Sequence, residues 1–322
     1  MRILVLHSDI AEDAPPEEQD TLVAAGAVAA ALQSQGHAVS QLPFIANPPA
    51  LHALLSREAP DIVFNLVEGV DGLGRLAPIA PRLLDEMGIA FTGASAAVMD
   101  LTNDKPLTKR RLRDAGLATP DWSEPPCWDG LDGGAYIVKS AAEDASLGLD
   151  DGCVVTGADA VRRRAADCAV RHGGRWFAER FVEGREFNIA VLQGADGPLI
   201  FPMAEMQFDS WPAGKPRIVG YDAKWDEKSS ASLRTVRVFG VETKEPLLAE
   251  KLRHACEQVW ALFGLSGFVR VDFRVTETGQ PLILEINTNP CISPDAGFAA
   301  AAAEAGFSYE SLIARIVEAA LP

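Results

Sequence analysis

Hydrophobic and polar residues alternate most regularly between residues 267 and 287. Within 268–275 the alternation has a period of two, which predicts a half-buried strand. A turn over 276–280 leads into a second alternating run over 281–287, so together they predict a β-hairpin. One face of this hairpin should carry Arg270, Asp272 and Arg274 from the first strand and Ile283, Glu285 and Asn287 from the second. A solvated edge hairpin shows the same alternation, so the pattern alone leaves both a binding site and a plain polar surface open.

The first hundred residues alternate between strand and helix patterns. Strands are expected at 3–7, 37–42, 61–66 and 90–93, and helices at 21–35, 51–58 and 78–87. This order predicts an α/β unit with a parallel sheet, whose loops gather at the carboxyl edge of the strands. The acidic, Pro-rich loop over 8–19 reads either as a mobile loop above a site or as a plain connector.

Two further units follow, so we expect a three-domain chain with boundaries at 1–100, 101–183 and 184–322. The second unit reads as a compact α+β lobe. Its expected helices lie at 107–115 and 158–171, and its strands at 135–139, 154–156 and 176–182. The third unit should contain a strand at 186–192, a helix at 246–263, the hairpin and a helical region at 297–320.

Charge and composition narrow the class of protein. The 322 residues carry a net charge of −16, which argues against a nucleic-acid partner or an anionic membrane surface. The sequence has no apolar run of membrane length and no signal peptide pattern. Its 5 cysteines lack CxxC spacing, which is typical of a reduced compartment. We therefore expect a cytoplasmic protein without a zinc site or a disulfide framework.

The polar face of the hairpin offers oxygen ligands. Asp272 and Glu285 supply carboxylates and Asn287 supplies an amide oxygen. These hard donors suit Mg²⁺ better than zinc, because Mg²⁺ binds one or two carboxylates and completes its shell with water and phosphates.

Two lysines are candidates for binding phosphate. Lys105 begins a basic helix, and Lys139 ends an apolar strand and opens the small-residue loop 140–148. No P-loop or Rossmann fingerprint is present, so converging ammonium groups and backbone N–H groups of that loop would have to hold a polyphosphate. Each lysine taken singly also fits a solvated surface charge.

The segment 179–187 joins the second unit to the third. A connecting strand of this kind can offer backbone groups to an adenine edge, and Glu186 could accept hydrogen bonds from ribose hydroxyls. An ordinary exposed glutamate fits the same pattern.

Taken together, the chain resembles the ATP-grasp superfamily and, within it, the D-alanine–D-alanine ligase family. The resemblance runs from about residue 61 onward and is strongest in the last third of the chain. The matching pieces are Asn103-Asp104-Lys105, Ile137-Val138-Lys139-Ser140, Glu179–Val182, Glu186–Val191, Tyr221–Lys224, Arg270–Phe273 and Glu285–Pro290. It implies an α/β (α+β ATP-grasp) fold that holds ATP between the central and C-terminal lobes.

The resemblance implies a nucleotide site. In it Lys105 and Lys139 hold phosphates, and Glu186 binds the ribose. Glu179 and the backbone of Phe181 and Val182 would read the adenine. The loop Ser146–Gly148 would close over ATP.

The resemblance also implies the reacting groups. Lys224 would contact the transferred γ-phosphate and Arg270 would stabilise the acyl phosphate and the oxyanion, with Ser146 of the closing loop beside them. Asp272, Glu285 and Asn287 would bind two Mg²⁺ ions, for which Mn²⁺ could substitute.

These groups would serve an ATP-dependent carboxylate–amine ligase acting on small amino-acid-like substrates through an acyl phosphate. The family resemblance further suggests a homodimer. A nucleotide-binding regulatory module that does not ligate remains the alternative.

The amino-acid side departs from the family pattern. Ala145 stands at the family's loop serine, and Lys224-Trp225 replaces a lysine-tyrosine pair. Cys291 stands at a glycine, and Ala296 at the serine that grips a substrate carboxylate. We therefore expect a product other than D-alanyl-D-alanine, although a rearranged pocket that still makes it stays open. Cys291 as a nucleophile finds little support, because no histidine lies near it in sequence.

Overall fold

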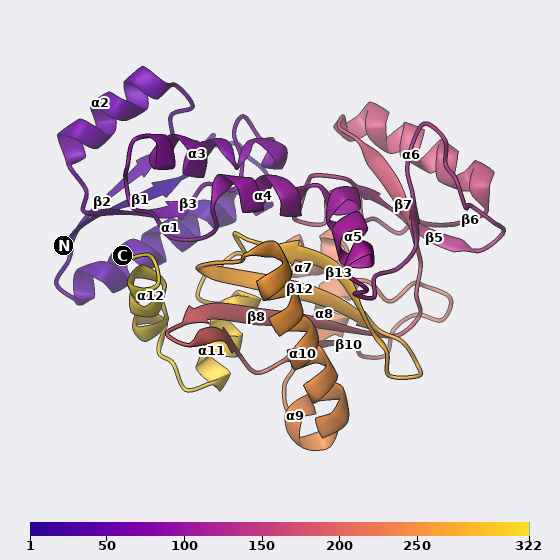
Figure 1. The fold of residues 1–322 in the computed structure, drawn as a ribbon. Coiled ribbons are helices and arrows are strands. Elements are labelled where there is room, and N and C mark those ends of the chain that lie inside the picture. The colour runs from indigo at the N-terminus through magenta and orange to yellow at the C-terminus, as the bar shows by residue number, and fades with distance from the viewer. Residues whose placement is uncertain (322) are drawn as a thin grey trace.

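The computed structural model describes residues 1–321, and its first sheet is parallel, as the sequence predicts (Figure 1). Strand β1 (Arg2–His7) lies between β2 (Ala38–Pro43) and β3 (Ile62–Leu66). Apolar side chains of β1 enter separate hydrophobic clusters on the two faces of the sheet. A strand buried on both faces is apolar throughout, which explains the run Ile3–Leu6.

Three local predictions for this unit are corrected. Helix α1 (Pro16–Ser34) begins before the predicted Thr21, because proline fits the first helical turn and Glu17 and Glu18 favour a helix N-terminus. The acidic loop is therefore shorter than predicted. The expected strand at 90–93 forms only an isolated bridge between Val63 and Phe91. The other helical segments are α2 (Pro48–Glu58), η1 (Gly74–Leu76), α3 (Ile79–Glu86) and α4 (Ala96–Asn103), the last of which the sequence pattern missed.

The central lobe is an antiparallel sheet with the strand order β4-β7-β5-β6. Helix α6 covers one face, where Val161, Ala165 and Cys168 pack against the strands. Strand β7 ends at Arg180, earlier than predicted. The elements are α5 (Lys105–Asp114), β4 (Trp122–Ser123), β5 (Ala135–Ser140), β6 (Val154–Thr156), α6 (Ala158–His172) and β7 (Trp176–Arg180).

The C-terminal lobe is built on an antiparallel sheet with the order β11-β10-β8-β12-β13, with β9 beside β8. Helix α10 packs on it through a buried apolar face, and it has the predicted bounds. The elements are β8 (Arg185–Gly194), β9 (Gly197–Ile200), β10 (Ala204–Phe208), α7 (Tyr221–Trp225), α8 (Ser230–Arg234), β11 (Thr235–Val238), α9 (Val241–Lys244) and α10 (Pro246–Phe263).

The predicted hairpin is formed by β12 (Phe268–Val275) and β13 (Pro281–Asn287), but its second strand does not alternate regularly. Asp272 pairs with Glu285, whereas the next pair is Phe273 with Ile283, so the register shifts by a β-bulge at Leu284. Ile283 is therefore buried in the core instead of sharing the polar face, and Leu284 faces the cavity described below.

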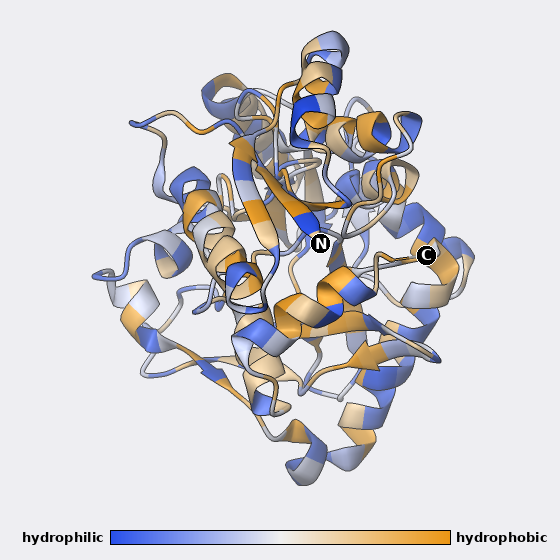
Figure 2. Ribbon diagram, turned by 90° about the vertical axis from the view of Figure 1, so that its left-hand side faces the viewer, coloured by the Kyte–Doolittle hydropathy of each residue, from blue (hydrophilic) through white to orange (hydrophobic). Residues whose placement is uncertain are grey.

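The predicted C-terminal helical region is two helices, α11 (Gly297–Glu304) and α12 (Tyr309–Glu318). Helix α12 packs against α1, so the end of the chain lies beside the first unit, as Figure 1 shows. Figure 2 shows the two termini close together and hydrophobic residues along the strands nearby. None of the helices within residues 1–321 has the length and apolar character needed to span a membrane.

Candidate active site

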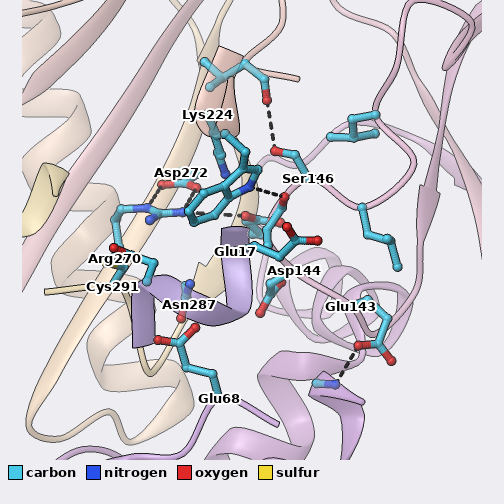
Figure 3. Close-up of a pocket in the computed structure, with 18 of the residues that line it drawn as sticks. Glu17, Glu68, Glu143, Asp144, Ser146, Lys224, Arg270, Asp272, Asn287 and Cys291 are labelled. Carbon is cyan, nitrogen blue, oxygen red and sulfur yellow. Dashed lines mark hydrogen bonds and ion pairs between the residues drawn. The ribbon is translucent and has the colours of Figure 1, made fainter. Parts of the chain in front are cut away.

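A cavity of about 880 Å³ lies where the first unit, the central lobe and the C-terminal lobe meet (Figure 3). Its lining includes the predicted residues Lys105, Lys139, Ser146, Glu186, Lys224, Arg270, Asp272, Glu285 and Asn287. The structure therefore brings together residues that are up to 182 positions apart, as between Lys105 and Asn287. Glu179, Phe181 and Val182 do not line it.

The hairpin supplies one wall of the cavity. Arg270 donates two hydrogen bonds to Asp272, each of 2.8 Å, and its guanidinium lies 3.9 Å from the Glu285 carboxylate. The Asn287 side-chain oxygen accepts from the backbone N–H of Asn289 at 3.0 Å. The pairing of Asp272 with Glu285 and of Arg270 with Asn287 places all four side chains on one face of the sheet.

Glu285 sits in a strongly cationic environment. Burial raises its pKa, but Lys105, Lys139, Arg270 and Lys224 outweigh that effect and lower the pKa to about 2. Burial, and next the charge of Arg270, lower the pKa of Lys224. An anion with several charges would relieve the repulsion among these cations.

Lys105 is buried, with 6% of its surface exposed. Its ammonium pairs with Asp144 at 2.7 Å and donates to the Glu143 backbone carbonyl at 3.0 Å. Glu285 lies 3.8 Å away. Burial lowers the pKa of Lys105, but Asp144 and Glu285 reverse this and raise it. Lys105 is thus a fixed positive charge at the base of the loop 140–148.

Lys139 pairs with Glu179 at 2.7 Å, and Glu179 also pairs with Lys109. No role was predicted for Lys109 from the sequence. Its signal is its place one helical turn after Lys105, which puts both lysines on the buried side of α5. The Phe181 backbone N–H donates to Ala135 at 3.0 Å.

Glu186 lies on the cavity wall and pairs with Arg274 at 3.1 Å. Burial raises the pKa of Glu186, while Arg274 opposes this. The alternation placed Arg274 on the same face as Arg270 and Asp272, but no role was predicted for it.

The loop 140–148 contacts the segment 219–225 over the cavity. Ser146 donates to the Val219 carbonyl at 3.1 Å, and the Trp225 indole donates to the Ala145 carbonyl at 3.0 Å. Tyr221 donates through its hydroxyl to Glu17 at 2.6 Å. The contacts therefore join the central lobe, the C-terminal lobe and helix α1, and the tyrosine–glutamate bond among them was not expected from the sequence.

The end of the cavity near the first unit is acidic. Asp20 accepts from the Cys291 thiol and from the Ser293 hydroxyl, each at 2.9 Å. Burial raises the pKa of Glu68 to about 8, and repulsion from Asp20 and Asp144 adds to this effect. Burial, Glu68 and Asp20 raise the pKa of Cys291, which disfavours the thiolate that a nucleophile needs. Figure 3 shows Glu68, Cys291 and Arg270 around the same space.

The donors on the hairpin fit a hard metal ion. Asp272, Glu285 and Asn287 present oxygen ligands on one face, with lysines nearby for phosphate. Among residues 1–321, no group of three or more His, Cys, Asp or Glu side chains is arranged to hold a metal ion. The amide oxygen of Asn287 is therefore needed to complete the ligand set on the hairpin.

Comparison with known proteins identifies the family. Residues 134–318 match the model described as "D-ala D-ala ligase C-terminus". The chain is also 31% identical over 274 residues to the D-alanine–D-alanine ligase of Laribacter hongkongensis, covering 83% of this chain and 82% of that one. The chain belongs to the D-alanine–D-alanine ligase family. It is thus an ATP-grasp ligase.

Solved structures show that this ligase shares the family fold over nearly its whole length. The D-alanine–D-alanine ligase of Bacillus anthracis complexed with ATP superposes with a TM-score of 0.74 at 18% identity, covering 99% of this chain and 97% of that one. The VanG D-Ala:D-Ser ligase of Enterococcus faecalis gives a TM-score of 0.73 at 14% identity, covering 99% of both chains.

Proposed function

We propose that this ligase joins a carboxylate to an amine through an acyl phosphate. A carboxylate oxygen attacks the γ-phosphorus of ATP and ADP leaves. The amine then attacks the acyl carbon, inorganic phosphate departs, and the nitrogen loses a proton. Both steps build negative charge close to the phosphoryl group.

The observation that carries this proposal is the convergence of Lys105, Lys139, Lys224 and Arg270 around Glu285 in one cavity. Such a cluster of cations suits a polyphosphate, and the Glu285 carboxylate among them would help to hold a metal ion that neutralises charge on the phosphates. A plain polar surface would expose these groups instead of burying them.

Asp272, Glu285 and Asn287 would hold Mg²⁺, with two ions as the family resemblance implies and Mn²⁺ as a substitute. When bound, the metal would neutralise charge on the phosphates. The lysines would hold the phosphates, and Glu186 the ribose. Glu179 at the end of β7, with the backbone of Phe181 and Val182, would read the adenine, although none of the three lines the cavity in this structure.

Arg270 and Ser146 act at the reacting end in this proposal. The Arg270 guanidinium faces the charge that develops on the acyl oxygen, where a fixed cation stabilises the transition state more than the ground state. The loop that carries Ser146 excludes water, which would otherwise hydrolyse the acyl phosphate.

We propose small amino-acid-like substrates other than the D-alanine pair. Trp225 and Cys291 alter the pocket, and a substrate ammonium beside Asp20 and Glu68 would lower the raised pKa of Glu68 and pair with both carboxylates. The structurally similar VanG enzyme is named a D-Ala:D-Ser ligase, which supports the idea that related proteins accept other amino acids. A homodimer and a cytoplasmic location remain part of the proposal.

Glu285→Gln tests the function. It keeps the shape of the side chain but removes the charge, so amine-dependent phosphate release from ATP should fall at least 100-fold while the circular dichroism spectrum is unchanged. The assay uses purified protein, Mg²⁺ and a panel of amino acids. An unchanged rate would refute the metal assignment, and a wild-type protein that no amino acid stimulates would refute ligation. Failure of D-alanine alone would exclude only the D-alanine pair.

A further inference from the structure

One cation in the cavity has no role in the proposed reaction. Arg237 lies on β11, the edge strand of the C-terminal sheet, opposite Met206 of β10. Both residues line the cavity. The Arg237 guanidinium lies beside the start of α11, where its nitrogen atoms are 3.6 and 3.7 Å from the position that a Cβ of Gly297 would take.

Arg237 differs from the other cavity arginines in its partners. Arg270 pairs with Asp272 and Arg274 pairs with Glu186. Within residues 1–321 Arg237 makes no ion pair with a carboxylate, and its one hydrogen bond is a long one of 3.5 Å to the Asp295 carbonyl. Burial lowers the pKa of Arg237, Asp295 opposes this, and Arg270 lowers it further.

A partly buried guanidinium without a carboxylate is costly, because its lost hydration is not replaced by an opposite charge. A ligand anion would supply that charge. The planar guanidinium of Arg237 suits a carboxylate, which can accept two parallel hydrogen bonds from it. The charge of the neighbouring Asp295 raises the pKa of Arg237, but its carboxylate makes no ion pair with the guanidinium, and Ala296 and Gly297 have no polar side chain.

The position of Arg237 indicates which anion binds. Arg237 and Arg270 line the same cavity, and Arg270 lowers the pKa of Arg237, whereas Lys105 and Lys139 lie by the loop 140–148 at the proposed nucleotide end. The substrate carboxylate that is phosphorylated must meet the γ-phosphate. A second anion near Arg270 therefore belongs to the other substrate, whose amine must approach the same carbon.

We propose that Arg237 binds the carboxylate of the amine-bearing substrate, which makes that substrate an amino acid. This inference rests on the proposed ligase function. Arg237 is thus a residue that sets specificity, and it would reject amines that lack an acid group.

The test compares wild type with Arg237→Ala and Arg237→Lys. The acceptors are glycine, D-alanine, L-alanine and D-serine, each beside its C-terminal amide. With the acids, Arg237→Ala should raise the acceptor KM by about 10- to 100-fold, the size of a lost charged hydrogen bond. Its KM for ATP should stay within about twofold of wild type, amides should be equally poor substrates of both proteins, and Arg237→Lys should recover part of the loss.

Arg234→Ala is the matched control, because Arg234 ends α8 next to β11 but does not line the cavity. It should behave as wild type. A higher KM for ATP in Arg237→Ala would overturn the proposal in favour of phosphate binding. Equal losses with acids and amides would overturn it as well.

Calorimetric titration of each acid into protein with Mg²⁺ and a non-hydrolysable ATP analogue separates this inference from the ligase function. If wild type binds an acid that Arg237→Ala does not, yet never turns over, the carboxylate site stands and ligation fails. If both proteins bind the acids equally, or neither binds any, the role of Arg237 is refuted whatever the turnover.

Discussion

Two charged side chains of this ligase are buried in the protein interior, where charged groups are rare. Lys109 and Glu179 have side chains that are 1% and 2% exposed, and they pair with each other inside the protein. Lys139 approaches Glu179 from the cavity, and Lys109 also donates to Thr119 at 2.8 Å. Thr119 donates in turn to Ile283 of β13 at 2.7 Å. Lys109 thus connects the proposed adenine-reading glutamate with the hairpin.

Lys109→Met should lower the free energy of unfolding by about 3–5 kcal/mol, because it leaves Glu179 buried with one cation fewer. Arg113→Met is the control on the same helix. Its partner Asp121 is exposed, so the loss should stay below about 1 kcal/mol. Urea unfolding measures both values, and equal effects would show that the buried pair adds nothing beyond a surface pair.

At the scale of elements, two close approaches position the site. Gly267, at the start of β12, has a φ of +68° and lies so near Gly93 that a Cβ would come within 2.6 Å of its Cα, so the hairpin contacts the first unit directly. The loop 140–148 is closed by the indole of Trp225 and the hydroxyl of Ser146. Two hydrogen bonds to the C-terminal lobe therefore hold this loop in place.

Trp225→Phe should favour the open loop, because it deletes the donor to the Ala145 carbonyl at a cost of about 0.5–1.5 kcal/mol. We expect more ATP hydrolysis per amide bond formed, by up to about tenfold, since water reaches the acyl phosphate. Assays of ADP and amide product give this ratio. Trp122→Phe, whose indole bonds Glu124 in the central lobe outside the cavity, should leave it unchanged. An unchanged ratio in Trp225→Phe would count against the role of this bond.

At the scale of the molecule, the cavity belongs to no single unit. The first unit provides Asp20 and Glu68, the central lobe provides Lys139, and the C-terminal lobe provides Lys224 and the hairpin. Lys105, at the start of α5, is a second lysine from the central lobe. A nucleotide bound here would contact both lobes and hold them together.

A non-hydrolysable ATP analogue with Mg²⁺ should therefore raise the melting temperature. At 100 times its Kd the stabilisation is about 2.7 kcal/mol, which is a shift of several degrees. Removing Mg²⁺ with EDTA should abolish most of the shift, and Lys139→Ala should reduce it at the same analogue concentration. Arg113→Ala should keep it. A shift of the same size in Lys139→Ala would contradict the phosphate role of that lysine.

Local pattern was enough to predict much of this protein. The buried strands of the first sheet, helix α10 and the hairpin follow from runs of apolar residues, because side-chain period and helix or strand geometry are properties of neighbouring residues. The polar face Arg270, Asp272, Glu285 and Asn287 follows from the same alternation. The motif resemblance predicted the family, which the comparisons confirm.

Only the tertiary structure decided which charges meet. Lys109 pairs with Glu179, and Tyr221 donates to Glu17, although no sequence period relates these residues. The bulge that buries Ile283 and the lack of an ion pair at Arg237 were likewise not predictable from local pattern. Electrostatic interactions act across space and depend on burial, so the pKa of Glu68 and the partners of Arg237 are fixed by how three units pack. The sequence determined the elements and the chemistry on each one, whereas their packing determined the pocket, because a cavity exists only between elements.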